Sequence, residues 1–393
     1  MPADTRSREE LLLREVLELG DEAPVTMLSR EPSGEGSVAG FTLAESGEEL
    51  TYFVDTSGRA VDRETGLVLG ELTAPEARVW LHPADPHLPA LAPVAFSDAA
   101  ATLLARLGVT ATGAPRLVAY RAGRRAVLSV DAEGGRQWVK VVRPDRVERI
   151  VEAHRALAAA GVPQPALRGW SDDGLVVIDQ AGGVPAADAL GAAGGSIDPD
   201  ALLDEVDGLR RRIAGAALRS PARTDMTRRL AWYADRLSVV LPGELAAGVA
   251  RTVAAVDGDW ESGDPVVIHG DLHFGQLFLD DAAAIAAVID VDTAGVGAAS
   301  DDTGAFLAHA IASAILTPPP RDERVWELAR AAARRWDAAS APGTRTRAVA
   351  HLLGHALGAW ETGAPVRAAR ILAAAHTVAA AEAHGLGRSA VFG

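Results

Sequence analysis

The chain changes its pattern near residue 181, and this change limits the folds that it can adopt. Up to that point most of the sequence reads as short apolar strands separated by turns. Beyond it, Ala, Leu and Arg dominate in helical patterns, which two short apolar strands interrupt at residues 266–269 and 286–290. Strands that come first and helices that follow are typical of α+β proteins. We therefore expect an antiparallel sheet followed by a helical lobe.

The first 95 residues are expected to form a unit of their own. An amphipathic helix is predicted over residues 8–19, and strand patterns follow it. These patterns lie at residues 38–43, 50–54 and 67–72. Four prolines then fall between His82 and Pro93, which is typical of a linker that crosses a surface. We place a domain boundary there and expect an extra N-terminal α/β cap domain over residues 1–95.

Residues 96–180 carry the pattern of an antiparallel sheet with one helix. A tight turn at residues 121–125 joins its first two strands, and the helix follows the third. The strand patterns lie at residues 117–120, 126–130, 137–142 and 174–180, and the helix lies at about 148–157. We interpret 96–180 as a small β-rich lobe, and 181–393 as a mainly helical lobe with a short hairpin in its middle.

The charge of the chain excludes some partners. A formal net charge of −15 argues against nucleic acid or an anionic membrane as the main partner. Residues 1–80 hold 17 acidic and 7 basic side chains, so this part alone carries −10. We favour a solvated acidic face over a docking surface for a cationic partner. The chain has no apolar leader, no apolar run of about 18 residues and no cysteine, so we expect a cytoplasmic protein.

The most informative polar residues follow the two strands of the second half. The first strand leads into His269-Gly-Asp-Leu-His-Phe-Gly-Gln276, which places Asp271 and Gln276 five residues apart in one loop. The second strand ends in Asp290 and Asp292. Phosphoryl transfer needs a carboxylate that accepts the proton of the attacking hydroxyl, and oxygen ligands that hold Mg²⁺ on the phosphates. A loop and a strand end that lie side by side supply both.

This arrangement resembles the aminoglycoside phosphotransferase family, whose members have a protein-kinase-like bilobal fold. The loop is most similar to those of bacterial maltokinases and glucosamine kinases, which carry Gln where the antibiotic kinases usually carry Asn. The resemblance implies that Asp271 is the catalytic base, that Gln276 and Asp290 bind Mg²⁺, and that Asp292 assists them. It covers residues 98–393 and leaves the N-terminal segment outside.

A lysine inside a strand supports the same interpretation. Lys140 interrupts the apolar run of residues 137–142, where kinases of this fold carry the lysine that contacts the α- and β-phosphates. The following helix offers Glu148 and Glu152 as its ion-pair partner, and Glu152 has the spacing that resembles the family's. An edge-strand lysine and a solvated helix face are the alternative interpretations.

The remaining nucleotide contacts are implied by the resemblance. Adenine is expected against the backbone at the end of the last strand, around Ile178, Gln180 and Ala181. The turn at 121–125 is the candidate for covering the phosphates, although it has one glycine and differs from the glycine-rich loop of protein kinases.

The acceptor site is expected in the helical lobe. An aromatic plate beside a carboxylate suits a protonated aminosugar, and Trp360 with Glu361 offers that pair. For each tryptophan, packing between helices is the alternative interpretation. The other candidates are Trp232, Trp326 and Trp336.

Several other patterns are interpreted as structural. No Gly-x-x-x-x-Gly-Lys-Ser/Thr occurs, so a P-loop nucleotide site is not supported. His351 and His355 have a spacing that metals use, but no third ligand is evident, so we interpret them as packing residues. His273 is expected to be structural. Asp301 and Asp302 resemble the acidic pair that braces the active-site loop in the family.

These features predict an ATP- and Mg²⁺-dependent small-molecule kinase. Its acceptor would be the hydroxyl of a sugar, an aminosugar or an aminoglycoside-like compound. A nucleotide-binding regulatory or scaffold protein with little turnover is the alternative. The sequence leaves the oligomeric state open.

Overall fold

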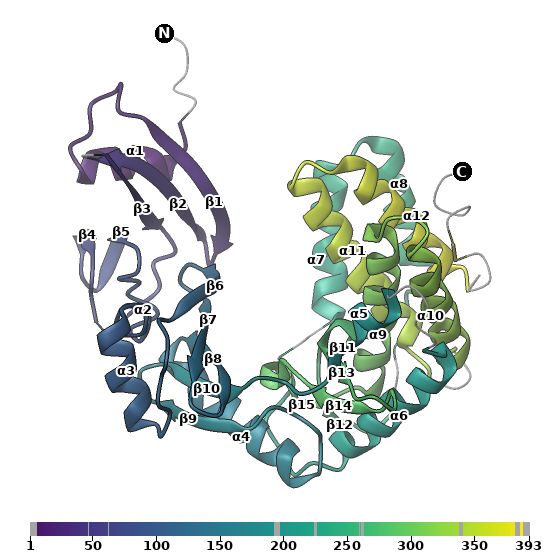
Figure 1. The fold of residues 1–393 in the computed structure, drawn as a ribbon. Coiled ribbons are helices and arrows are strands. Elements are labelled where there is room, and N and C mark those ends of the chain that lie inside the picture. Colours follow the sequence, from purple (N-terminus) through teal and green to yellow (C-terminus); the bar gives the residue numbers. More distant parts are fainter. Residues whose placement is uncertain are drawn as a thin grey trace. The chain divides into compact units, whose positions relative to one another are not determined.

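The chain forms two compact units, which Figure 1 shows coloured from purple at the N-terminus to yellow at the C-terminus. The first comprises Met1–Val151 and Ala166–Gln180, and the second comprises Glu152–Pro165 and Ala181–Gly393. No described helix combines the length and the apolar composition that a bilayer span requires. The computed structural model describes residues 6–45, 47–61, 63–191, 197–223, 226–258, 260, 263–337, 341–381 and 386–387.

The first unit begins with a helix that lies against an antiparallel sheet. The hydroxyl of Ser7 accepts a hydrogen bond from the Glu10 amide and so caps helix α1 (Arg8–Val16). Leu13 is buried in the core that this helix forms with Phe41 and Val54. The strands are β1 (Val25–Ser33), β2 (Gly36–Glu45), β3 (Glu48–Asp55), β4 (Leu67–Glu71) and β5 (Ala74–Leu81), and they are hydrogen-bonded in the order β1-β2-β3-β5-β4.

The sequence predicts α1, β2, β3 and β4 and misses β1 and β5. Most side chains of β1 are exposed, and Pro32 lies near its end, so this edge strand lacks the alternation that marks a half-buried strand. Strand β5 contains Pro75 and then a run of buried residues at 77–80, which gives no alternation either. Both strands are therefore defined by their pairing and not by a local pattern.

The segment at residues 82–93 is buried, and the prediction of a linker that crosses a surface is wrong. Asp85 and His87 are 1% and 5% exposed. His87 Nε2 lies 2.7 Å from Asp55 Oδ2, and the Tyr120 hydroxyl donates to Asp85 Oδ2 over 2.8 Å. The prolines turn the chain inside the unit, and its polar side chains find buried partners elsewhere in the sequence.

A second antiparallel sheet follows in the same unit. Side chains along its strands alternate between two faces: Val139 and Val177 pack with helix α3 (Ser97–Arg106), whereas Val176 packs with helix α4 (Val147–Ala159). This sheet has the order β6-β7-β8-β10-β9. The elements are α2 (Leu91–Ala95), α3 (Ser97–Arg106), β6 (Arg116–Arg121), β7 (Arg125–Ala132), β8 (Gly135–Val142), η1 (Pro144–Arg146), α4 (Val147–Ala159), β9 (Leu167–Ser171) and β10 (Leu175–Asp179). Helix α4 begins in this unit, and its part from Glu152 onward belongs to the second unit.

The predicted strands and helix of this sheet are confirmed, and β9, α2 and α3 were not predicted. Strand β9 is Leu-Arg-Gly-Trp-Ser, in which Gly169 and Arg168 interrupt any apolar pattern. A side chain at Gly169 would press against Leu107, since an added Cβ would lie 2.9 Å from the Leu107 Cβ. The glycine therefore allows the close packing that places this edge strand.

The second unit is mainly helical, and it contains two small sheets with the orders β11-β13-β14 and β12-β15 among the described residues. Its strands and short helices are β11 (Val184–Pro185), β12 (Val266–Ile268), η2 (Phe274–Gln276), β13 (Leu277–Leu279), β14 (Ile285–Val288), η3 (Val291–Thr293) and β15 (Gly295–Gly297). Its longer helices are α5 (Ala186–Gly191), α6 (Pro199–Ala214), α7 (Met226–Val240), α8 (Gly243–Ala254), α9 (Ala299–Leu316), α10 (Asp322–Arg335), α11 (Thr344–Glu361) and α12 (Pro365–Ala379). Antiparallel sheets therefore come first and helices follow, as predicted.

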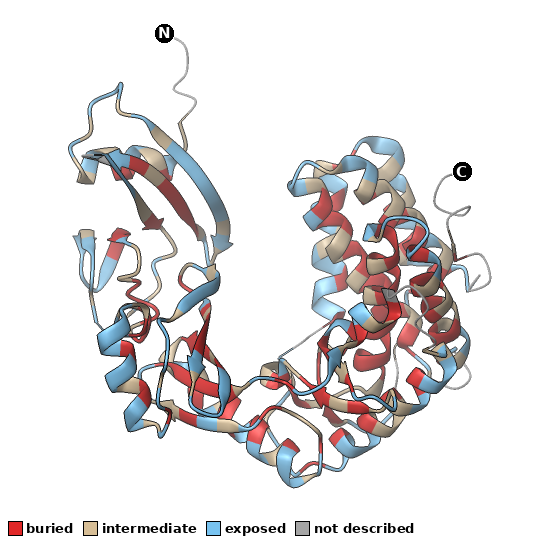
Figure 2. Cartoon of the chain, in the orientation of Figure 1, coloured by how far each residue is buried: buried red, intermediate tan, exposed pale blue. Residues whose placement is uncertain are grey.

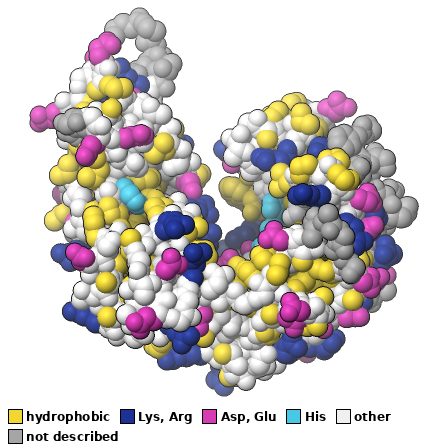
Figure 3. Space-filling model, viewed as in Figure 1, with side chains coloured by type: hydrophobic (Ala, Val, Ile, Leu, Met, Phe, Trp, Pro, Cys, Tyr) yellow, Lys and Arg dark blue, Asp and Glu magenta, His cyan; other side chains and the backbone are white. Residues whose placement is uncertain are grey.

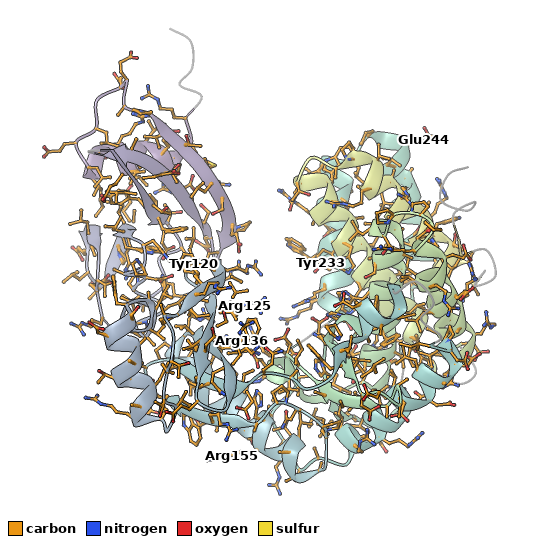
Figure 4. The ribbon with its side chains drawn as sticks, in the orientation of Figure 1. Tyr120, Arg125, Arg136, Arg155, Tyr233 and Glu244 are labelled. Carbon is orange, nitrogen blue, oxygen red and sulfur yellow. The ribbon has the colours of Figure 1, made fainter. Side chains whose placement is uncertain are left out.

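Glycines let three of these helices approach closely. A Cβ on Gly354 of α11 would lie 2.8 Å from the ring of Tyr233, which projects from α7 in Figure 4. A Cβ on Gly304 of α9 would lie 2.5 Å from the Arg347 Cβ of α11. Figure 2 shows buried residues along α9, α10 and α11. This close packing brings side chains of α9 and α11 together.

The acidic side chains of the first unit do not gather in one patch on the face that Figure 3 draws. They lie apart from one another among uncharged and basic side chains. Some are paired: Glu31 lies 2.7 Å from Arg121, and Glu64 lies 2.8 Å from Arg78. On that face, the observation favours a solvated acidic surface over a docking surface.

Candidate active site

Two short strand pairs bring the two polar segments of the second unit side by side. Strand β13 pairs with β14, and β12 pairs with β15, both antiparallel. The Ile289 amide donates to the Gln276 carbonyl over 3.0 Å. The buried ring of His269 closes the other side, because its Nε2 lies 3.0 Å from the Ile289 carbonyl oxygen. The loop at 269–276 and the strand end before Asp290 therefore form one connected structure.

Asp302 holds the backbone of this loop. Its two carboxylate oxygens accept hydrogen bonds from the amides of His269 and Gly270, over 2.9 and 2.8 Å. Gly270 has φ +85°, and a Cβ there would lie 2.8 Å from the Thr293 carbonyl oxygen, so glycine is needed. The structural role predicted for the pair of aspartates is thus seen in Asp302. Its neighbour Asp301 is paired with Arg347.

Asp271 follows this braced backbone and keeps 42% of its side chain exposed. Burial raises the pKa of Asp271. Interactions with the nearby imidazoles of His309, His351 and His273 together outweigh burial and lower this pKa to about 2. His309 Nε2 lies 3.6 Å from Asp271 Oδ1. At neutral pH Asp271 is therefore an ionised and accessible carboxylate.

Four histidines surround this carboxylate, and sequence reasoning did not bring them together. The rings of His273 and His309 stack with their centroids 4.2 Å apart. The His309 ring also contacts those of His355 and His351, at centroid distances of 4.7 and 5.9 Å. His309 thus lies beside His351 and His355, whose interpretation as packing residues stays a prediction. His309 belongs to the apolar helix α9, and its contact with the histidines of α11 depends on how the two helices pack. No local sequence pattern predicts that contact.

Burial keeps most of these imidazoles neutral. It lowers the pKa of His273 and His351 to about 3 and that of His355 to about 4, and repulsion from His309 adds to the effect. The charge of Asp290 acts in the opposite direction on His273, so that carboxylate lies within electrostatic reach of the loop.

The predicted Mg²⁺ ligands offer oxygen atoms of the right kind. Gln276 is buried, and its Oε1 accepts from the His273 amide over 3.2 Å, which leaves that oxygen a second lone pair. Asp290 is exposed and has φ 59°, a left-handed conformation at the end of β14. Asp292 is half-buried, with Oδ1 3.9 Å from His154 Nε2. Two carboxylates and an amide oxygen are the donors that Mg²⁺ prefers, so the residues present fit this ion.

The predicted lysine lies in the first unit. Lys140 is 8% exposed in β8, where it faces Val127 of β7 and Val176 of β10. Glu152 belongs to the second unit, is exposed and accepts a hydrogen bond from the Ser220 hydroxyl over 2.7 Å. Their ion pair stays a prediction.

The end of β10, where the sequence predicts the adenine contact, is held by pairing and hydrogen bonds. Ile178 pairs with Trp138 in the sheet, and the Trp138 indole donates to Gln180 Oε1 over 2.6 Å. The Gln180 amide donates to the Arg136 carbonyl over 3.1 Å. Ala181 is buried. These contacts fix the strand end, and the adenine contact stays a prediction.

The turn at 121–125 is tied to the N-terminal residues of the same unit. The Gly123 amide donates to Asp85 Oδ2 over 2.7 Å, and Arg121 makes two hydrogen bonds to Glu31. Arg124 donates to the Pro32 carbonyl. Figure 4 labels Tyr120 on the strand before the turn and Arg125 on the strand after it. The turn that we expected to cover phosphates therefore has a fixed backbone.

The tryptophans divide into buried and accessible groups. Trp326 and Trp336 are 0% and 5% exposed, so they pack in the helical core. Trp232 is 57% exposed beside Tyr233, and Trp360 is half-buried against the core. The accessible ones are the remaining acceptor candidates. Glu361 lies 3.4 Å from Arg236, and both are about half exposed.

Comparisons with known proteins identify the fold. No family model and no curated protein sequence matches the chain. The crystal structure of aminoglycoside phosphotransferase APH(4)-Ia has 17% sequence identity and a TM-score of 0.51, over 71% of this chain and 97% of its own. A thermostable mutant of that enzyme, in a ternary complex with AMP-PNP and hygromycin B, has 18% identity and a TM-score of 0.51, over 72% and 97%. Macrolide 2'-phosphotransferase type I has 18% identity and a TM-score of 0.45, over 71% and 95%.

The chain thus has a mixed α/β fold, in which antiparallel sheets come first and a helical part follows. In particular, the chain has the kinase-like fold of the aminoglycoside phosphotransferase structures.

Proposed function

We propose that the chain is a member of the aminoglycoside phosphotransferase family that transfers the γ-phosphoryl group of ATP to a hydroxyl of a small molecule. One observation carries the proposal: Asp271 is accessible and ionised in a loop whose backbone Asp302 holds rigidly. The kinase-like fold supports it, because the structures that share this fold are phosphotransferases.

Asp271 would act on the acceptor hydroxyl. Its carboxylate accepts the hydrogen bond of the hydroxyl and orients the oxygen toward phosphorus. With a pKa near 2 it is a weak base, so it takes the proton late, as the new O–P bond forms and the bond to ADP breaks. Orientation is therefore its larger contribution.

The other site residues would hold the nucleotide. Gln276 and Asp290 bind Mg²⁺, with Asp292 assisting, and the bound ion would neutralise charge on the phosphates. Lys140, paired with Glu152, would contact the α- and β-phosphates. Ile178, Gln180 and Ala181 would supply the backbone contacts to adenine.

The acceptor is proposed to be a sugar, an aminosugar or an aminoglycoside-like compound. Similarity of the loop at 269–276 to those of maltokinases and glucosamine kinases favours the first two. Trp360 and Glu361 are the proposed acceptor contacts in the helical part, because Trp360 keeps part of its ring accessible. Residues 1–95 would be a cap domain on a lobe formed by 96–180, with 181–393 as the helical lobe, in a cytoplasmic enzyme.

ATP consumption tests this proposal when it is measured across a panel of sugars, aminosugars and aminoglycosides. We expect Mg²⁺-dependent turnover with at least one class of acceptor, and its loss in Asp290→Ala. Asp281→Ala is the matched control, because Asp281 is an exposed carboxylate in the turn after β13. A regulatory protein without turnover would bind ATP and phosphorylate no member of the panel.

A further inference from the structure

A cluster of imidazoles beside Asp271 has no part in the proposed phosphoryl transfer. Its members come from three segments: His273 from the loop, His309 from α9, and His351 and His355 from α11. One ligand atom from each of Asp271, His273 and His309 lies within 4.8 Å of the other two. Two helices and a loop therefore converge on one carboxylate with nitrogen donors.

We propose that Asp271, His273 and His309 bind a transition-metal cation such as Zn²⁺, at a site distinct from that of the Mg²⁺ that accompanies ATP. Zinc sites have ligand distances of about 2.0–2.2 Å to imidazole and carboxylate, so ligand atoms stand roughly 3.4 Å apart in a tetrahedron. The stacked rings of His273 and His309 would also turn, so that their nitrogen lone pairs meet at the ion, while the ligand atoms move closer by about 1 Å. Three protein ligands leave one position open for water.

The donor set selects the ion. Imidazole nitrogen with one carboxylate suits Zn²⁺, Co²⁺ and Ni²⁺, whereas Mg²⁺ prefers oxygen ligands throughout. Gln276 and Asp290 supply oxygen donors alone and are the proposed Mg²⁺ ligands. The two kinds of donor therefore separate the two ions, and neither site needs the ligands of the other.

Packing alone explains this cluster poorly. The His351 Nε2 atom is buried and has no hydrogen-bond partner among the described residues. A buried polar atom without a partner costs about 1–3 kcal/mol, and apolar side chains would fill the same space without that cost. Metal binding gives a reason for imidazoles here, with His351 and His355 setting the position of the His309 ring that they contact.

The consequence for activity rests on the proposed function. A cation held by Asp271 occupies the carboxylate that would orient the acceptor hydroxyl. Zn²⁺ would then inhibit phosphoryl transfer at saturating Mg²⁺ and ATP, and a chelator would restore the rate. The metal would thus be a reversible inhibitor that occupies the catalytic carboxylate.

Binding is tested on the full chain without any substrate. We expect one equivalent of Zn²⁺ by calorimetry, and a four-coordinate visible spectrum when Co²⁺ is added. His309→Gln and His273→Gln should each weaken Zn²⁺ binding at least about 10-fold. His376→Gln is the matched control, because His376 is exposed on α12 and should leave the affinity unchanged. Circular dichroism of each variant separates a lost ligand from a lost fold.

The proposal is overturned if the parent chain binds neither ion, or if both variants fold and keep the parental affinity. The second arm measures ATP turnover against Zn²⁺ concentration. In the parent, the half-inhibiting Zn²⁺ concentration should match the measured Kd. In His309→Gln, the inhibition should be relieved, and both results together support inhibition by the bound metal. If the parent binds the metal but phosphorylates no acceptor, the metal site stands and the proposed kinase function fails.

Discussion

A buried aspartate holds a loop in each of the two units, and the two loops differ in what they support. In the first unit, Asp85 accepts the amides of His87 and Gly123 over 2.9 and 2.7 Å. In the second, Asp302 accepts two adjacent amides of the loop that presents Asp271. The same contact therefore joins distant segments in one unit and shapes a reactive loop in the other.

Burial and hydrogen bonding act on the pKa of Asp85 in opposite directions. Burial is the largest influence and raises its pKa, even though hydrogen bonds from Gly123, Tyr120 and His87 oppose this. A buried carboxylate without a cationic partner is thus costly, and it is retained where several N–H and O–H groups would otherwise be unpaired. We expect the two aspartates to differ most in their effect on activity.

Of the two buried aspartates, Asp302 is expected to give the larger effect when it is replaced by alanine. The substitution leaves two buried amides without acceptors, which should reduce the free energy of unfolding by about 3 kcal/mol. The loop would shift, and a displacement of about 1 Å at the reacting groups lowers kcat about 100-fold. Denaturant unfolding and ATP turnover measure the two effects, with Asp281→Ala as the control. Parental kcat in a folded Asp302→Ala protein would contradict the role of the brace.

Asp85→Ala should separate stability from catalysis. The variant loses the acceptor of two amides and a hydroxyl but also loses a costly buried carboxylate, so we expect a loss of about 2 kcal/mol in unfolding free energy. The expected kcat is within about 3-fold of the parent, because general-base function rests on the second unit. A rise in KM for ATP would follow if the turn at 121–125 covers the phosphates. An equal loss of kcat in the two variants would remove the distinction between the loops.

The site was predictable where its residues are neighbours in sequence, and it was not where packing assembles it. Asp271 and Gln276 lie in one loop after an apolar strand, and Asp290 ends the next strand pattern, so the sequence identifies the two segments that meet, and the roles of these residues stay predictions. His309 reaches the same place only because α9 packs on α11. No periodicity in either helix encodes which face meets the other.

The fold shows the same division. Strands such as β7 and β8 were predicted, because each carries a short apolar run between turn residues. The segment at 82–93 was mistaken for a surface linker because its partners are distant in sequence: Asp55 lies 32 residues before His87, and Tyr120 lies 35 residues after Asp85. Proline indicates where a chain turns, but whether the turn is buried depends on the residues that pack against it.

A third carboxylate is expected to affect stability alone, and it sharpens the contrast with Asp85. Glu9 is buried, yet hydrogen bonds from Arg30 and Ser37 outweigh burial and lower its pKa to about 2 from an ordinary 4.5. Its contribution to stability is therefore complete above pH 4.5 and is lost as the pH falls toward 2. Since Arg30 is half exposed, we expect only about 2 kcal/mol.

Thermal unfolding of Glu9→Gln from pH 3 to pH 7 checks this. The difference in stability from the parent should be largest near neutral pH and should shrink below pH 4.5. Glu15→Gln, an exposed position on the same helix, is the control. A difference that grows as the pH falls would mean that burial, and not the cation, dominates at Glu9.

The central claim is that Asp271 acts on the acceptor hydroxyl while Lys140 acts on the nucleotide. Steady-state kinetics of Asp271→Asn, with saturating acceptor and varied ATP, test it most directly, and Lys140→Ala is the companion variant. We predict that Asp271→Asn lowers kcat by about 10²- to 10⁴-fold and leaves KM for ATP near its parental value, whereas Lys140→Ala also raises KM for ATP. Parental kcat in Asp271→Asn would contradict the account.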